Sequence, residues 1–119
     1  MRWSKIEDNK IDGDYMDITE MQNFIEEFCK RNNLNHSVEI RILDLVSEIG
    51  ELAKEILLAS NYGERKVKSN EKVKLEIGDA LFSLVTVAND LDINMEKALK
   101  DVMKKYEKRI AKHQNPGSC

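Results

Sequence analysis

The sequence has 119 residues and a mass of 13.8 kDa, which is the size of a single domain. Hydrophobic residues make up 41% of the sequence and charged residues 34%. The hydrophobic share is large enough for a packed core and argues against intrinsic disorder. The formal net charge of −3 excludes a globally basic nucleic-acid-binding protein, and charges interrupt every apolar run, so no membrane-spanning segment is predicted.

The two ends of the chain differ from its centre. Residues 1–16 are polar, show no sustained hydrophobic period and lack the apolar segment of a secretory signal, so we expect a lead-in segment. A helical domain over residues 17–112 and a tail over residues 113–119 follow. Cys29 and Cys119 form no CxxC motif, which favours two reduced thiols in a cytoplasmic protein over a zinc site or a disulfide framework.

The scarcity of helix-breaking residues predicts an all-α fold. The sequence has five glycines and one proline, and it is rich in Glu, Lys, Leu and Ile. Asp17 begins the first helix, because Asp17 and Glu20 form a capping-box pattern, and this helix ends within residues 31–33. Ser37 is the N-cap of a second helix, which ends near Ser60.

Two further helices complete the predicted domain. Ser69 or Asn70 caps the third helix, which runs to about Leu91, and Asn94 caps the fourth. Short connections between long helices favour antiparallel neighbours and therefore a four-helix bundle. Because four amphipathic helices of this length bury only a modest core, we expect a second copy of the chain to complete the bundle.

The third helix is apolar on two sides. Its main apolar stripe comprises Val73, Ile77, Ala80, Leu84 and Val87. Leu75 and Phe82 lie on the opposite side, and a narrow polar stripe separates the two. Such a helix is expected to be buried on both sides, so that its acidic residues face an interior cleft. One chain has little left with which to cover Leu75 and Phe82, which predicts at least a homodimer.

A short acidic motif occurs twice, as Glu48-Ile49-Gly50-Glu51 in the second helix and as Glu76-Ile77-Gly78-Asp79 in the third. Acids three residues apart lie on adjacent turns, and two such pairs on neighbouring helices can converge into oxygen ligands for Mg²⁺ or Mn²⁺. The alternative for the second helix by itself is a solvated acidic face. Gly50 and Gly78 either permit close helix approach or leave room for a ligand, or they are merely tolerated.

The fourth helix carries a basic flank. Lys105, Arg109 and Lys112 lie along one edge of its apolar face, with Tyr106 beside them. This flank suits the binding of phosphate oxygens, which arginine contacts in bidentate fashion. The alternative is a rim of cations that stabilises the C-terminus of the helix. Carboxylates, a divalent metal and cations are together the components of phosphoryl chemistry.

These motifs, in this order, resemble the MazG-like, all-α nucleoside triphosphate pyrophosphohydrolases. The matching stretches are SEIGELAKEI, KLEIGDALFSL and the basic ending KKYEKRI, and the resemblance covers about residues 17–112. It implies Mg²⁺-dependent hydrolysis of an NTP or dNTP to the monophosphate and pyrophosphate, as an enzyme that maintains the nucleotide pool.

The resemblance also implies roles for particular residues. The implied metal ligands are Glu48, Glu51, Glu76 and Asp79. Glu48 or Glu51 would orient or deprotonate the attacking water, directly or through the metal. Lys105 and Arg109 would contact phosphates, with Tyr106 assisting. Members of the family form homodimers or dimers of dimers, in which the active site can include helices of both chains.

The sequence leaves the substrate's base and sugar open. Some relatives that cleave dCTP have a tyrosine where this sequence has Ser83, and others have a tryptophan-rich base pocket, whereas the only tryptophan here is Trp3. The residues that bind the base are therefore not predicted. Two alternatives to an NTP pyrophosphohydrolase are a phosphoribosyl-ATP pyrophosphatase of histidine biosynthesis and a non-enzymatic helical dimerisation module.

Overall fold

The structure is a computed structural model that describes residues 16–68 and 70–113. This part of the chain forms the four predicted helices and no strand. Their bounds are Ile18–Arg31 for α1, Val38–Ala59 for α2, Glu71–Asp90 for α3 and Met95–His113 for α4. The predictions for the lead-in segment with Trp3, for Cys119 and for Ser69 as a cap fall outside the described residues.

Each helix begins where the sequence places a side chain that can accept a hydrogen bond from a free backbone N–H. The caps are Asp17, Ser37, Asn70 and Asn94, each bonded to an N–H three residues on. The capping box at α1 is reciprocal, because Asp17 Oδ1 accepts from the Glu20 amide at 2.7 Å and Glu20 Oε1 accepts from the Asp17 amide at 2.9 Å. The predicted helix starts are therefore confirmed.

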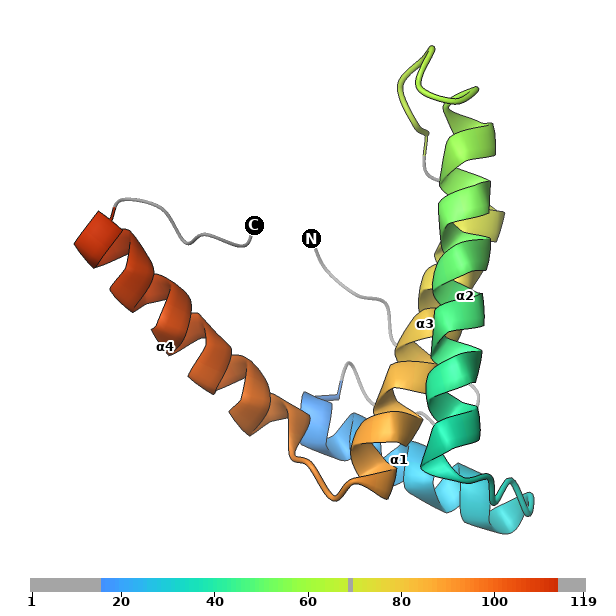
Figure 1. Cartoon of the computed structure of the whole chain (residues 1–119). Coiled ribbons are helices and arrows are strands. Elements are labelled where there is room, and N and C mark those ends of the chain that lie inside the picture. The colour runs from blue at the N-terminus through green and yellow to red at the C-terminus, as the bar shows by residue number, and fades with distance from the viewer. Residues whose placement is uncertain (1–15, 69, 114–119) are drawn as a thin grey trace.

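Helices α2 and α3 form a long antiparallel hairpin, and α1 lies across the base of this hairpin (Figure 1). The hydrophobic core lies where α1 meets α3. Its buried members are Ile25, Cys29 and Val85, and it is extended by the partly buried Met21, Phe24, Leu34, Phe82 and Met95. The core is small, and Val85, with 1% of its surface exposed, is its most deeply buried member.

Buried polar side chains fix the position of α1 against the end of α3. Gln22 is 7% exposed, and its side-chain amide donates to Asn89 Oδ1 at 3.0 Å and to the Ile93 carbonyl at 2.8 Å. Asn89 donates back to the Gln22 carbonyl at 3.0 Å. Gln22 Oε1 also accepts from the Met95 amide at 2.9 Å. One glutamine thus ties α1 to the end of α3 and to the start of α4.

Helix α4 does not close a bundle within one chain. It packs on α1 near its own N-terminal end and then extends away from the α2–α3 hairpin (Figure 1). None of the described residues of α4 is buried, and Leu99, Met103 and Ile110 are each about half exposed. These positions recur at helical spacing, so α4 has an apolar stripe that nothing in the described chain covers.

The expectation for the two sides of α3 needs correction. In the predicted main stripe, Val73 and Ala80 are buried as expected, but Ile77 and Leu84 are 52% and 42% exposed. The polar Ser83 and Thr86 are buried instead. Phe82 is covered within the chain, because its ring packs edge to face on Phe28 with centroids 6.2 Å apart. The argument that Phe82 requires a second chain is therefore wrong, because α1 partly covers the ring. Leu75, the other residue of that argument, is 57% exposed.

Candidate metal and active site

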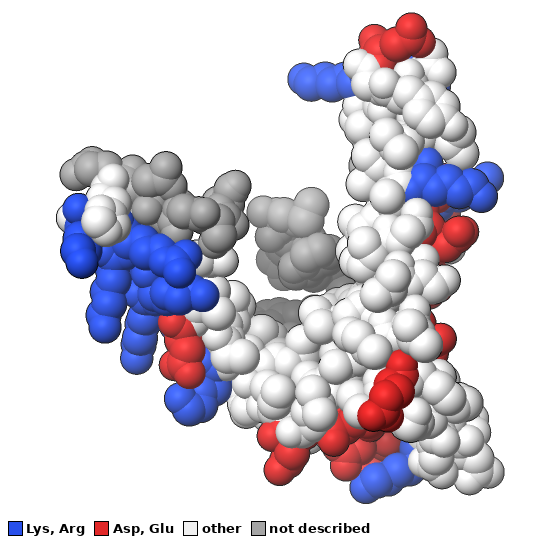
Figure 2. Space-filling model, viewed as in Figure 1, with Lys and Arg blue, Asp and Glu red and all other residues white. Residues whose placement is uncertain are grey.

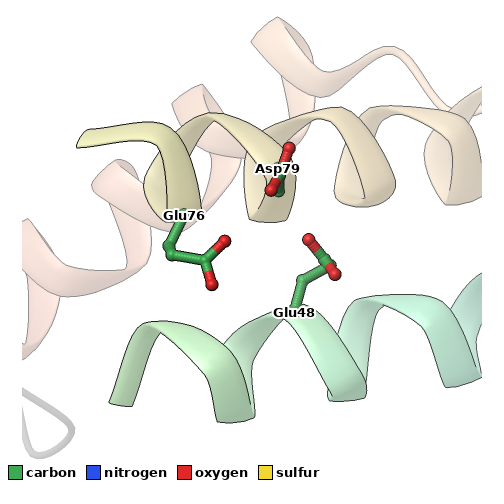
Figure 3. Close-up of side chains that lie close together, drawn as sticks. All are labelled: Glu48, Glu76 and Asp79. Atoms are coloured by element: carbon green, nitrogen blue, oxygen red, sulfur yellow. The ribbon is translucent and has the colours of Figure 1, made fainter. Parts of the chain in front are cut away.

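Three carboxylates face one another across the α2–α3 hairpin (Figure 3). Glu48 projects from α2, and Glu76 and Asp79 project from adjacent turns of α3. One carboxylate oxygen from each lies within 4.8 Å of the others. The three side chains are brought together because the hairpin sets the two acidic motifs side by side. The sequence-based expectation of convergence is met for these three residues.

The carboxylates oppose one another's ionisation. Partial removal from water raises the pKa of Glu48, and the charge and hydrogen bonding of Asp79 raise it further. The pKa of Glu76 is raised by the same causes, with desolvation first and Asp79 second. Clustered carboxylates with raised pKa values are stabilised by a bound cation, because its charge removes their mutual repulsion.

Glu51 lies at the edge of this cluster. It is exposed and does not belong to the group of three oxygens within 4.8 Å, but its charge contributes to the raised pKa values of Glu48 and Glu76. The packing of α2 on α3 does not depend on the missing side chains of Gly50 and Gly78. A Cβ added to either glycine meets no described atom within 4 Å, so that part of the expectation is wrong within one chain.

A pocket of about 250 Å³ adjoins the cluster. It is lined by Glu55, Lys72, Leu75, Glu76 and Asp79. Two members of the carboxylate cluster thus open onto a space that also offers an ammonium group. A divalent metal held by the carboxylates would border this pocket, which leaves room for ligands that are not protein side chains.

The predicted basic flank lies on a different part of the molecule. Lys105 Nζ stands 5.5 Å from the centre of the Tyr106 ring, and Arg109 lies one turn further along α4. Figure 2 shows lysine and arginine side chains gathered over the C-terminal part of α4, away from the hairpin. A single chain does not bring this flank to its own carboxylate cluster, because α4 diverges from α2 and α3.

Sequence reasoning missed one buried ion pair. Arg41, at 7% exposure, donates from Nε to Asp90 Oδ2 at 2.8 Å and from Nη2 to the Leu34 carbonyl. The pair joins the start of α2 to the end of α3 and borders a pocket of about 220 Å³ that also contains Asn35 and Thr86. The available signal was an arginine between Ile40 and Ile42 in an otherwise apolar run.

Comparison with known protein families shows which family has this order of acidic motifs and helices. The model of the MazG nucleotide pyrophosphohydrolase domain matches residues 36–113, which include both acidic motifs and all of α4. The chain belongs to this family. The matched range includes α2, α3 and α4 and therefore contains every predicted site residue. The sequence-based resemblance to MazG-like proteins is confirmed, and so is the all-α fold with four helices.

A curated bacterial protein is similar to part of the chain. The chain is 47% identical over 68 residues to the uncharacterized protein YpjD of Bacillus subtilis (strain 168), a match that covers 55% of this chain. The chain spans 60% of the length of that relative.

In the described part of the chain, no helix combines the length and the apolar character that a membrane span requires.

Two crystal structures share the fold of the MazG domain. One is the Bacillus-conserved MazG protein, a nucleotide pyrophosphohydrolase, with a TM-score of 0.67 and 27% identity over 79% of this chain and 93% of that one. The other is the putative pyrophosphatase YPJD from Bacillus subtilis, with a TM-score of 0.66 and 32% identity over 77% of this chain and 96% of that one.

Proposed function

We propose that this chain is a Mg²⁺-dependent nucleoside triphosphate pyrophosphohydrolase that releases a nucleoside monophosphate and pyrophosphate. The observation that carries the proposal is the convergence of Glu48, Glu76 and Asp79 in a chain that belongs to the MazG nucleotide pyrophosphohydrolase family. Three carboxylates are a donor set that suits a hard divalent cation such as Mg²⁺, with Mn²⁺ as a substitute.

The proposed ligands are the three converging carboxylates, with Glu51 at their edge as a fourth. When bound, Mg²⁺ would neutralise charge on the phosphate oxygens and lower the pKa of bound water. The pKa values of Glu48 and Glu76 are raised in the metal-free protein, and a bound cation would lower them by stabilising the ionised carboxylates. We assign the positioning or deprotonation of the attacking water to Glu48 or Glu51, since Glu48 lies inside the cluster and Glu51 beside it.

The phosphate contacts are assigned to the basic flank of α4, namely Lys105, Tyr106 and Arg109. Because α4 diverges from the hairpin of its own chain, we propose that a second copy supplies this flank to the carboxylate cluster. The uncovered apolar stripe of α4 supports this association, as do the exposed Leu43 and Val46 of α2, at 67% and 64% exposure. A homodimer, or a dimer of such dimers, would bury these surfaces.

The experiment is a substrate panel with product identification. The purified protein is incubated with each NTP and dNTP, and with phosphoribosyl-ATP, in Mg²⁺ and in EDTA, and pyrophosphate and phosphate are measured separately. We expect pyrophosphate only in the presence of the metal, and none from Asp79→Asn. Turnover of phosphoribosyl-ATP alone would assign the chain to histidine biosynthesis instead. Release of inorganic phosphate, or no turnover of any substrate, would contradict the proposal.

A further inference from the structure

The connector between α2 and α3 concentrates positive charge in a chain that is acidic overall. Residues 64–68 contain Arg65, Lys66 and Lys68 against a single acid, Glu64. These three cations line a pocket of about 560 Å³ together with Ala59 and Asn70. Among the residues that the structure describes, no acid lines this pocket, whereas Glu55, Glu76 and Asp79 line the pocket beside the carboxylate cluster.

The backbone of this connector is held in an unusual conformation. Asn61, Tyr62 and Gly63 are three successive residues with φ of 49°, 59° and 94°, in the left-handed region. The buried Ser60 stabilises the turn, since its Oγ accepts from the Gly63 amide at 3.0 Å and its carbonyl accepts from the Arg65 amide at 3.0 Å. These bonds fix the backbone of the turn as far as Arg65, the first of the three cations.

The three cations are not used to hold the fold together by ion pairing. Within the described residues, the ion pairs lie elsewhere in the chain and include none of Arg65, Lys66 or Lys68. The neighbouring Glu64 accepts a hydrogen bond from the side chain of Asn61 instead. Arg65 donates from Nε to the Ala59 carbonyl at 3.2 Å, which orients its guanidinium along the pocket wall.

We propose that this pocket, the connector pocket, binds the phosphate groups of a small ligand without a metal ion. Guanidinium and ammonium groups form charge-assisted hydrogen bonds with phosphate oxygens, and three of them balance much of the charge of a pyrophosphate or triphosphate group. The volume of about 560 Å³ is in the range of small-molecule sites. The inference does not depend on the proposed catalysis, because it involves neither the carboxylate cluster nor α4.

The test is calorimetric titration of the full-length protein in EDTA. EDTA removes divalent metal ions, so that ligand binding that requires a metal is not observed. The ligands are inorganic pyrophosphate, a nucleoside triphosphate and the matching nucleoside. The variants are the double substitution Lys66→Ala with Lys68→Ala, the charge-matched control Lys97→Ala with Lys100→Ala on the exposed face of α4, and Arg109→Ala. The double variant Lys66→Arg with Lys68→Arg retains the charge, and circular dichroism verifies that every variant is folded.

We expect pyrophosphate to bind the wild-type protein in EDTA and to bind the Lys66→Ala, Lys68→Ala variant about tenfold or more weakly, since two charged contacts are lost. The arginine variant and the α4 control retain wild-type affinity, and the nucleoside does not bind. Equal affinities for pyrophosphate and the triphosphate would identify an inorganic ligand, and tighter triphosphate binding a nucleotide. Wild-type affinity in the alanine variant, an equal loss in the α4 control, or a loss confined to Arg109→Ala would overturn the proposal.

Discussion

Glu48 of α2 and Asp79 of α3 present their carboxylates to each other across the hairpin, and Asp79 helps to raise the pKa of Glu48. In the absence of a cation this pairing destabilises the fold, because two negative charges are brought together by the packing of two helices. Ordinary stability would favour a lysine at one of the positions. This repulsion supports the proposed metal site, and several consequences of that proposal can be measured.

Neutralising one member of the cluster separates stability from metal binding. Glu48→Gln keeps the size of the side chain but removes a charge that opposes Asp79. We expect the metal-free variant to melt at a higher temperature than the wild type, and to lose both the stabilisation by Mg²⁺ and the turnover. The measurement is thermal unfolding with and without Mg²⁺. Glu27→Gln, an exposed acid of α1, serves as control, and a Glu48→Gln protein still stabilised by Mg²⁺ would refute the ligand assignment.

Stability should fall as the pH rises in the metal-free protein. The folded-state pKa values of Glu48 and Glu76 lie above their ordinary value of 4.5. Between the ordinary and the raised values, the folded state binds more protons than the unfolded state, so the free energy of unfolding decreases with pH and then levels off. Mg²⁺ binds the deprotonated ligands, so its stabilising effect grows over the same interval.

Urea unfolding of the wild type and of Glu76→Gln across this pH interval isolates the contribution of that residue. The difference between the two proteins should be smallest at the acid end, where Glu76 is protonated in both states of the wild type. Parallel curves at all pH values would show that Glu76 has no raised pKa.

A substitution at Gly78 tests whether the function requires a residue without a side chain beside Glu76 and Asp79. Gly78 lies in the interior of α3, and a Cβ there meets no described atom within 4 Å. Gly78→Ala should therefore stabilise the fold by about 1 kcal/mol through helix propensity, which raises the melting temperature by a few degrees. If the space is needed by a ligand or a second chain, turnover falls although stability rises. Unchanged turnover would mean that the glycine is merely tolerated.

The start of α4 depends on one buried amide. Gln22→Leu removes the side-chain partner of Asn89 Oδ1, the Ile93 carbonyl and the Met95 amide, and we expect a loss of about 2 kcal/mol in the free energy of unfolding. Asn23→Leu, on the exposed neighbour, is the control and should change stability by no more than about 0.5 kcal/mol. Chemical denaturation measures both. Equal free energies of unfolding for the two variants would show that the hydrogen bonds of Gln22 do not stabilise the fold.

Mixing two inactive variants tests whether one chain supplies the carboxylates and another the basic flank. Asp79→Asn and Arg109→Ala are each expected to be inactive alone. A heterodimer of the two has one site with intact carboxylates from one chain and intact Arg109 from the other. After denaturation and joint refolding, about a quarter of the wild-type activity should return, because half of the dimers are mixed and one of their two sites is intact. No recovery would place both groups in the same chain.

The sequence by itself determined the helices and their ends, because both depend on neighbours in the chain. Asp17, Ser37, Asn70 and Asn94 cap helices through bonds to amides three residues away, and the apolar spacing between the caps is a local property. The two acidic motifs were visible for the same reason. Their convergence was expected from antiparallel packing of α2 on α3, and the structure bears this out. Connection length alone does not decide such packing, because α4 diverges from α3 after the shorter connection of residues 91–94.

Only the tertiary structure decided which faces are buried and where α4 goes. Val73 and Ala80 of the predicted stripe are buried, but Ile77 and Leu84 are exposed. Helix α1 packs on α3 around Val85 and Phe82, which lie outside that stripe. The ion pair of Arg41 with Asp90 joins residues 49 positions apart, and the bond of Gln22 with Asn89 joins residues 67 apart. Interactions between distant residues leave no periodic signal, so the divergence of α4 from the α2–α3 hairpin could not be inferred from local spacing.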